Sequence, residues 1–378
     1  MSLDRRAHED LSGCSISMLP EKTAVYALTP QGMPLGFRLA EATGGALFLA
    51  ASLPEAGEAA VRFHSLSGQV AENFRQYGLH IFVAATGLVV RCLAPLLQSK
   101  RSDPAVLVVD QKARFVISLL SGHLGGANAC AAAVAAFLGA VPVITTATDL
   151  EDLPALDLLA RDRKLIPADD AAFAPVSAAL LAGQTVGLHD PDDRLGLGRH
   201  PLFSPLPRPL PAPPCVLITE TAPAAPAGCL ILHPPVLYAG IGLRRDTPAE
   251  PILQALRETL DSHGLARQSL AALASADAKR EEPGLIQAAR ALALPLIFFP
   301  KAVLEDLPVT SPSPKALEAF GLRGVCEPAA LAAAQGLPLP EAPRCAAVLL
   351  CPKRRFPHVT IAVALRRQPP APDLPHAD

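Results

Sequence analysis

One uncharged stretch, residues 116–148, constrains the fold of this chain more than any other feature. It reads VISLLSGHLGGANACAAAVAAFLGAVPVITTAT and contains no Asp, Glu, Lys or Arg. A membrane-spanning helix needs about 20 consecutive apolar residues, but glycines, a histidine and an asparagine interrupt the first half, and Gly139 and Pro142 interrupt the second. The stretch therefore predicts a strand, a polar Gly-rich turn, an Ala-rich helix over 127–138 and a further strand over 141–145. Ligands of open α/β sheets bind where a strand leads into a helix, so the turn SGHLGGAN is a candidate site.

The overall charge excludes a general nucleic-acid binder. The 378 residues carry a net charge of −2, whereas such proteins present a strongly basic face. Eight cysteines occur without a C-x-x-C pair, which is typical of buried thiols in a reducing compartment. The first residues contain no apolar signal-peptide segment. We therefore expect a cytoplasmic protein that contacts neither nucleic acid nor membrane.

Alternating strands and helices predict an α/β protein of several domains. Residues 21–150 are expected to form a doubly wound, mostly parallel sheet of the flavodoxin-like kind, with strands that include 80–85, 105–110 and 115–120. Residues 151–235 are expected to form a small α/β middle domain, helical over 151–182, with Pro-rich loops or a linker at 201–214 and 223–235. Residues 236–366 are expected to form a C-terminal α/β domain, and 367–378 a disordered tail. Thr247-Pro-Ala-Glu250 has the pattern of a capping box before a helix at 248–263.

Several phrases in these domains carry a family resemblance. Residues 84–110, 117–128 and 142–149, together with GIG-x-RR at 240–245, K-x-x-E-P-G-L at 279–285, GV-x-EPAAL at 324–331 and PK…VTIAVA at 352–364, closely resemble the CbiG family, the cobalt-precorrin 5A hydrolases of anaerobic cobalamin biosynthesis. The resemblance implies an enzyme that opens the δ-lactone between a ring-A acetate and carbon C20 of a cobalt-corrinoid, and then releases C20 with its methyl group as acetaldehyde. It implies no resident cofactor or metal, because the substrate carries the cobalt, and transient contact with other enzymes of the pathway.

Two positions depart from the family phrase GIGCRRGT. Leu243 stands where the family has Cys, which removes any thiol chemistry there, and Asp246 stands where it has Gly. The charge of Asp246 favours a helix N-terminus but is expected to weaken anion capture by Arg244 and Arg245. These departures favour a binding or supporting role for the C-terminal domain.

The implied reaction needs an activated water, an oxyanion site and a base, and the Gly-rich turn offers all three. An unperturbed histidine titrates near ~6.5, so the residue type of His123 suits general acid or base work, with Asp149 to hold its tautomer; the alternative is a structural hydrogen bond. Backbone amides of Gly122, Gly125 and Gly126 suit an oxyanion or a carboxylate, and simple turn geometry is their alternative. Ser121 is a further contact; a Ser121–His123–Asp149 triad is conceivable, but SGHLGG lacks the G-x-S-x-G pattern.

Other polar residues are candidate substrate contacts. Asn128 and Thr86 either bind a ligand or cap a helix. Thr86 and Gly87 lie where a strand leads into a helix, a position equivalent to that of the Gly-rich turn. Basic residues suit the carboxylates of the macrocycle, although solvated surface charge and a Lys279–Glu282 ion pair are the alternatives. The remaining candidates are Arg91, Thr145, Thr146, Arg244, Arg245, Lys279 and Lys353.

Two rival functions differ from hydrolysis in kind. A non-catalytic carrier would pass tetrapyrrole intermediates between enzymes without turnover. A flavodoxin-like nucleotide binder is a weaker alternative, because no Ser/Thr-Gly phosphate loop follows the first strand.

Overall fold

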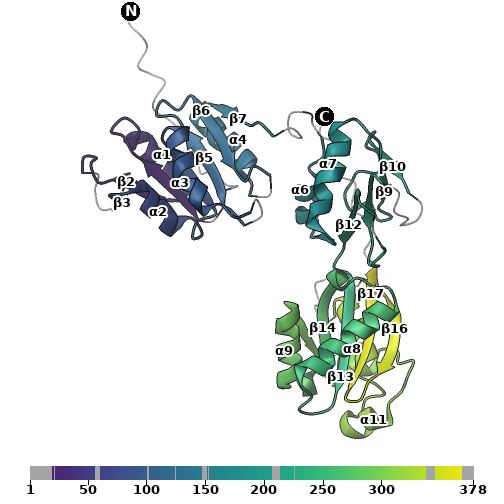
Figure 1. Ribbon diagram of the computed structural model, residues 1–378. Coiled ribbons are helices and arrows are strands. Elements are labelled where there is room, and N and C mark those ends of the chain that lie inside the picture. The colour runs from purple at the N-terminus through teal and green to yellow at the C-terminus, as the bar shows by residue number, and fades with distance from the viewer. Residues whose placement is uncertain are drawn as a thin grey trace, which may run out of the picture. The chain divides into compact units, whose positions relative to one another are not determined.

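The computed structural model (Figure 1) describes residues 19–20, 22–55, 60–99, 102–123, 125–146, 151, 153–206, 213–224, 226–337 and 345–367. The chain divides into two compact units, Met1–Leu158 and Leu159–Asp378. Among the described residues, no helix is both long and apolar enough to cross a membrane.

The first unit is built on a seven-stranded sheet with the order β3-β2-β1-β4-β5-β6-β7. Every neighbouring pair is parallel except β5–β6, which confirms the mostly parallel sheet. Without the short edge strand β3, which was not predicted from the sequence, β2-β1-β4-β5 follows the flavodoxin-like order. The strands are β1 (Thr23–Ala27), β2 (Ala46–Ala50), β3 (Ala60–Phe63), β4 (Leu79–Val83), β5 (Ala105–Val109), β6 (Phe115–Leu120) and β7 (Val141–Val143).

Helices cover both faces of this sheet, so its central strands are buried on each side. Helices α1 (Met33–Thr43) and α4 (Ala127–Leu138) pack in one apolar core with alternate residues of β1, β4 and β5. Helices α2 (Leu66–Asn73) and α3 (Thr86–Leu93), which leads into a short 3-10 helix η1 (Ala94–Leu96), pack on the other face. Gly139 ends α4 in a left-handed conformation with φ +68°, as expected for a helix C-terminus.

Strand β6 runs antiparallel to β5. The Gly-rich turn after β6 and the turn after β4, which carries Thr86, therefore lie at opposite edges of the sheet, that is, at opposite ends of its strands. Only residues 110–114 connect β5 to β6, and parallel strands need a crossover of about a dozen residues. The Asp110 carboxylate accepts the amides of Lys112, Arg114 and Phe115 at 2.8–2.9 Å and closes a tight hairpin. The turn after β6 therefore lies beside the start of β5, whereas Thr86 follows the end of β4. The expectation that these turns are equivalent was wrong.

The second unit contains two sheets, the first of which corresponds to the middle of the chain. Its order is β10-β9-β11-β12-β8, with only β8 antiparallel to its neighbour. Two sequence expectations were wrong here: β8 interrupts the helix expected over 151–182, and the proline-dense 223–235 includes a fully buried strand, β12. The apolar run CLILH explains this, because prolines flank but do not enter it. The elements are α6 (Leu156–Asp162), β8 (Ile166–Pro167), η2 (Asp170–Ala172), α7 (Phe173–Leu181), β9 (Val186–His189), β10 (Phe203–Pro205), β11 (Cys215–Ile218) and β12 (Cys229–His233).

The C-terminal sheet has the order β15-β14-β13-β17-β16. Strands β13, β14 and β15 are parallel, and β17 and β16 form an antiparallel hairpin beside β13. The strands are β13 (Leu237–Leu243), β14 (Leu270–Ala276), β15 (Leu296–Phe299), β16 (Ala346–Arg355) and β17 (Val359–Arg367). The helices are α8 (Ala249–Ser262), η3 (Arg267–Ser269), η4 (Asp277–Lys279), α9 (Pro283–Leu292), α10 (Lys301–Glu305), α11 (Pro314–Phe320) and α12 (Cys326–Gln335).

Helices pack closely on both faces of this sheet. Helices α8 and α9 cover one face, and α12 covers the other. At Gly240 a Cβ atom would lie only 1.8 Å from the Cys326 carbonyl oxygen, so α12 can lie directly on β13 only because this residue is glycine. The carboxyl ends of β13 and β14 meet the β16–β17 hairpin at the same edge, where Leu243 pairs with Val359.

Candidate functional site

A cavity of about 610 Å³ opens at this edge of the C-terminal sheet. Its described lining residues include no Asp or Glu, but they include six basic residues, Arg244, Arg245, Lys279, Lys315, Lys353 and Arg355. Four of these six were predicted substrate contacts. The structure brings them together from the β13–α8 loop, the β14–α9 connection and the end of β16.

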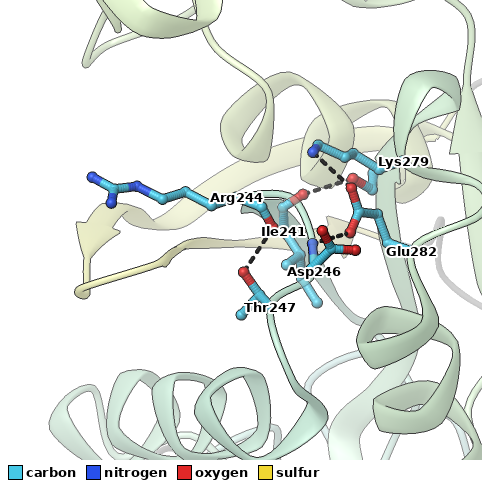
Figure 2. Close-up of polar contacts among 7 residues, drawn as sticks. Ile241, Arg244, Asp246, Thr247, Lys279 and Glu282 are labelled. Atoms are coloured by element: carbon cyan, nitrogen blue, oxygen red, sulfur yellow. Dashed lines mark hydrogen bonds and ion pairs between the residues drawn. The ribbon is translucent and has the colours of Figure 1, made fainter.

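The β13–α8 loop is held by hydrogen bonds to the backbone amide and the backbone carbonyl of Arg244. The amide of Arg244 donates to the His358 carbonyl at 2.9 Å, and the Thr247 hydroxyl donates to the Arg244 carbonyl at 2.7 Å. Thr247 therefore does not cap α8, whose N-cap residue is Pro248 without a side-chain hydrogen bond, and the predicted capping box was wrong. Figure 2 shows the Arg244 side chain extending away from the other residues drawn.

Asp246 contributes to this loop through its backbone. Its φ of +57° is left-handed, a conformation that favours glycine. This accounts for the Gly at this position in the family phrase GIGCRRGT. Its amide donates to Glu282 Oε2 at 2.9 Å. Asp246 is not among the lining residues, and the expectation that its charge weakens anion capture by Arg244 and Arg245 stays a prediction.

Lys279 and Glu282 form the helix-end ion pair that the sequence suggested. The two charged groups are 3.0 Å apart and both residues are buried, so each charge is compensated within the protein (Figure 2). The Lys279 ammonium also lies 5.6 Å from the centre of the Phe320 ring. Since its charge is already paired, Lys279 supports the wall of the cavity more than it offers a carboxylate anchor.

A second buried carboxylate, Glu327, fixes the opposite wall and was not among the predicted site residues. Its oxygens accept four hydrogen bonds of 2.6–3.1 Å from the Thr310 amide and hydroxyl, the Ser311 amide and the Lys353 amide. Burial raises the pKa of this carboxyl, but the four hydrogen bonds together lower the pKa by a larger amount, so the net shift is downward. The Lys353 ammonium donates to the carbonyls of Ser311 and Pro312, so Lys353 is also largely used in holding the wall.

Four basic side chains remain available to a ligand. Arg244, Arg245, Lys315 and Arg355 are exposed, and none of their side chains makes an ion pair or hydrogen bond with the rest of the described chain. Phe320, Val325 and Phe356 give the cavity apolar surface between them. Guanidinium groups bind carboxylates through paired hydrogen bonds, so the arrangement suits a partly apolar ligand with several carboxylates. Lys315 and Arg355 were not among the predicted substrate contacts, because no local pattern links them to Arg244.

The Gly-rich turn brings a different set of predicted residues together. The Ser118 hydroxyl donates to Asn128 Oδ1 at 2.7 Å, and Asn128 Nδ2 donates to the Thr146 hydroxyl at 3.0 Å. The Asn128 side chain is buried and does not cap α4, which begins after Gly126. Thr145, next to Thr146, is exposed at the same edge. The side chain of Asn128 thus joins β6, α4 and the segment after β7.

The glycines of this turn are required by its packing. A Cβ on Gly122 would lie 2.7 Å from Asn128 Oδ1, and one on Gly125 would lie 2.4 Å from the Cβ of Ser121. The amide of Gly126 donates to the His123 carbonyl at 2.8 Å, so it is not available to an oxyanion as predicted. The Ser121 hydroxyl donates to the Asp103 carbonyl at 2.8 Å. A role for the Gly125 amide stays a prediction.

His123 is half-buried in the turn, and it lies close to a carboxylate that was not predicted. Its Nδ1 lies 3.7 Å from Asp157 Oδ1 in α6. Asp149, which we had expected to orient His123, lies outside the described residues. Thr86, Gly87 and Arg91 lie at the opposite edge of the same sheet, where the Arg91 guanidinium donates to the Gly87 carbonyl at 3.0 Å.

The described residues contain no cluster of three or more His, Cys, Asp or Glu side chains arranged to hold a metal ion. The chemistry of the cavity is instead that of an anion site.

Comparison with known proteins places the chain in a family. Three family models match in chain order: the cobalamin synthesis G N-terminal model over residues 68–149, the cobalamin biosynthesis central region over 154–234 and the cobalamin synthesis G C-terminus over 237–364. A relative from Salmonella typhimurium named cobalt-precorrin-5A hydrolase is 38% identical over 337 residues, which are 85% of this chain and 94% of the relative.

A second relative agrees with this placement, and one solved structure is similar in sequence to part of the chain. A relative from Priestia megaterium with the same name is 30% identical over 307 residues, 77% of this chain and 79% of the relative. The crystal structure of CobE, a protein from the cobalamin (vitamin B12) biosynthetic pathway, is 43% identical over 35% of this chain and 93% of its own, with a TM-score of 0.32. On the three matching models and the extent of the Salmonella match, this chain belongs to the CbiG family of cobalamin biosynthesis.

Proposed function

We propose that this protein hydrolyses cobalt-precorrin 5A: it opens the ring-A acetate δ-lactone and releases acetaldehyde to give cobalt-precorrin 5B. The names of its relatives support the substrate. The observation that carries the proposal is the cavity of the C-terminal sheet, in which four exposed basic side chains surround apolar surface without an opposing carboxylate in the described lining. A corrinoid with acetate and propionate side chains presents the matching chemistry.

In this proposal Arg244, Arg245, Lys315 and Arg355 bind the carboxylate rim of the substrate. The Lys279–Glu282 pair and Glu327 keep the two walls in place. The macrocycle edge contacts Phe320 and Phe356, and the cobalt enters and leaves as part of the substrate. Hydrolysis requires only water and proton transfer, so the proposal includes no resident cofactor.

The sequence-based assignment of His123 as a base remains part of the proposal. Opening the lactone and breaking the bond to C20 each require a proton acceptor. A half-buried carboxylate neighbour such as Asp157 suits a histidine in that role.

The test is acetaldehyde release from enzymatically prepared cobalt-precorrin 5A, with the mass of the corrinoid followed in parallel. We expect many acetaldehyde molecules per protein chain, and a product mass that is lower by the mass of acetaldehyde less that of the water taken up in hydrolysis. Stoichiometric binding of the corrinoid without acetaldehyde would contradict the proposal and favour a tetrapyrrole carrier.

A further inference from the structure

The cavity of the C-terminal sheet contains a single described side chain that can accept a proton near neutral pH. Arginine and lysine stay protonated there, and the described lining includes no Asp, Glu, Cys or Tyr. The remaining lining residues are apolar, Gly or the hydroxyl residues Ser313 and Thr360, apart from His358. If the lactone is opened in this cavity, His358 is therefore the lining group suited to activate water.

The backbone holds His358 beside an anion-binding group. The Phe356 amide donates to the Val359 carbonyl at 2.8 Å, which closes the turn that carries His358 between β16 and β17. The His358 carbonyl accepts the Arg244 amide at 2.9 Å. The His358 side chain is exposed and makes no hydrogen bond or ion pair with the described chain. A proton acceptor and a guanidinium thus occur on adjacent segments, both fixed by the β13–β17 pairing.

We propose that His358 is the general base of lactone opening and that Arg244 beside it stabilises the oxyanion. A water oxygen bonds to the lactone carbonyl carbon, its proton passes to the His358 imidazole, and the carbonyl electron pair moves to oxygen. When this adduct collapses, the ring C–O bond breaks and the imidazolium returns the proton to the departing alkoxide. Lactone and water give one carboxylic acid and one alcohol, so atoms and charges balance. This inference rests on the proposed function.

The experiment compares His358→Gln with His123→Gln and with His64→Gln, an exposed histidine of the first unit, in the full-length protein. Glutamine keeps hydrogen bonding but does not accept the proton. We expect His358→Gln to lower kcat for acetaldehyde release by about 10²–10⁴-fold with KM within twofold of wild type. The acid limb of the kcat–pH profile should disappear, and imidazole should partly restore His358→Ala. Uroporphyrin, a porphyrin whose side chains are all carboxylates, should bind with unchanged Kd.

The outcomes separate this inference from the function on which it rests. An active wild type with His358→Gln within threefold of it in kcat overturns the inference and leaves the function. A raised KM with unchanged kcat also overturns it, because His358 would then only bind. Loss of activity in His123→Gln together with normal activity in His358→Gln also overturns the inference and identifies His123, in the Gly-rich turn, as the base. An inactive wild type overturns the proposed function, and the inference with it.

Discussion

Replacing Glu327 by Gln should loosen the cavity wall by an amount that the structure allows us to estimate. Glu327 is 1% exposed, and each of its oxygens accepts two hydrogen bonds. The amide of glutamine is best placed toward the Thr310 hydroxyl, which can turn to accept it, but the Lys353 amide then has no acceptor. An unsatisfied buried N–H costs about 1–3 kcal/mol, and the remaining bonds lose their charge assistance. We therefore expect a loss of about 3 kcal/mol in local stability.

Hydrogen exchange followed by mass spectrometry is the appropriate assay, because the affected donors are backbone amides. A loss of about 3 kcal/mol corresponds to a decrease of about 100-fold in protection at Thr310, Ser311 and Lys353. Glu318→Gln, at an exposed position of α11, is the matched control and should change stability by less than about 0.5 kcal/mol.

The same carboxylate sets a pH dependence with a definite sign. Because the folded pKa of Glu327 lies below its ordinary value, the stabilisation is present above that value and is lost as pH falls through the folded pKa. Glu327→Gln should remove this acid limb. Unchanged protection at the three amides in the variant would refute the view that Glu327 holds the wall.

Three further predictions follow from the described contacts. Burial lowers the pKa of His80 to about 4, so the unfolded state binds a proton between pH 7 and pH 5 that the folded state does not bind. The free energy of unfolding of the first unit should therefore fall by about 2 kcal/mol over this range. An unchanged urea midpoint between pH 7 and pH 5 would contradict this. Arg244→Ala should raise the Kd for uroporphyrin about tenfold at low salt, less at high salt, whereas the exposed Arg290→Ala should leave calorimetric binding unaltered. Asp246→Gly should raise the free energy of unfolding by about 1 kcal/mol because glycine removes the left-handed strain, and a lower urea midpoint would show that its side chain has a stabilising role.

Much of the local structure could be predicted because it depends on local patterns. The uncharged stretch predicted an Ala-rich helix over 127–138, and α4 spans these residues. The spacing of Lys279 and Glu282 suggested their ion pair, which the structure contains.

The site itself depends on relations that no local pattern records. The short connection 110–114 signals that β6 reverses direction, but its consequence for the Gly-rich turn appears only when the whole sheet is assembled. Lys315, Arg355 and His358 join Arg244 through α11 and the β16–β17 hairpin, which lie far from Arg244 in sequence. The Lys279–Glu282 pair could be suggested from the sequence, but the contacts of Lys353 with Glu327, Ser311 and Pro312 could not.

The measurement that tests the central claim most directly is a crystal structure of the protein with its product, cobalt-precorrin 5B. Our account predicts the corrinoid in the C-terminal cavity, with its carboxylates within hydrogen-bonding distance of Arg244, Arg245, Lys315 or Arg355. A corrinoid bound elsewhere, with these four side chains in contact only with solvent, would contradict it.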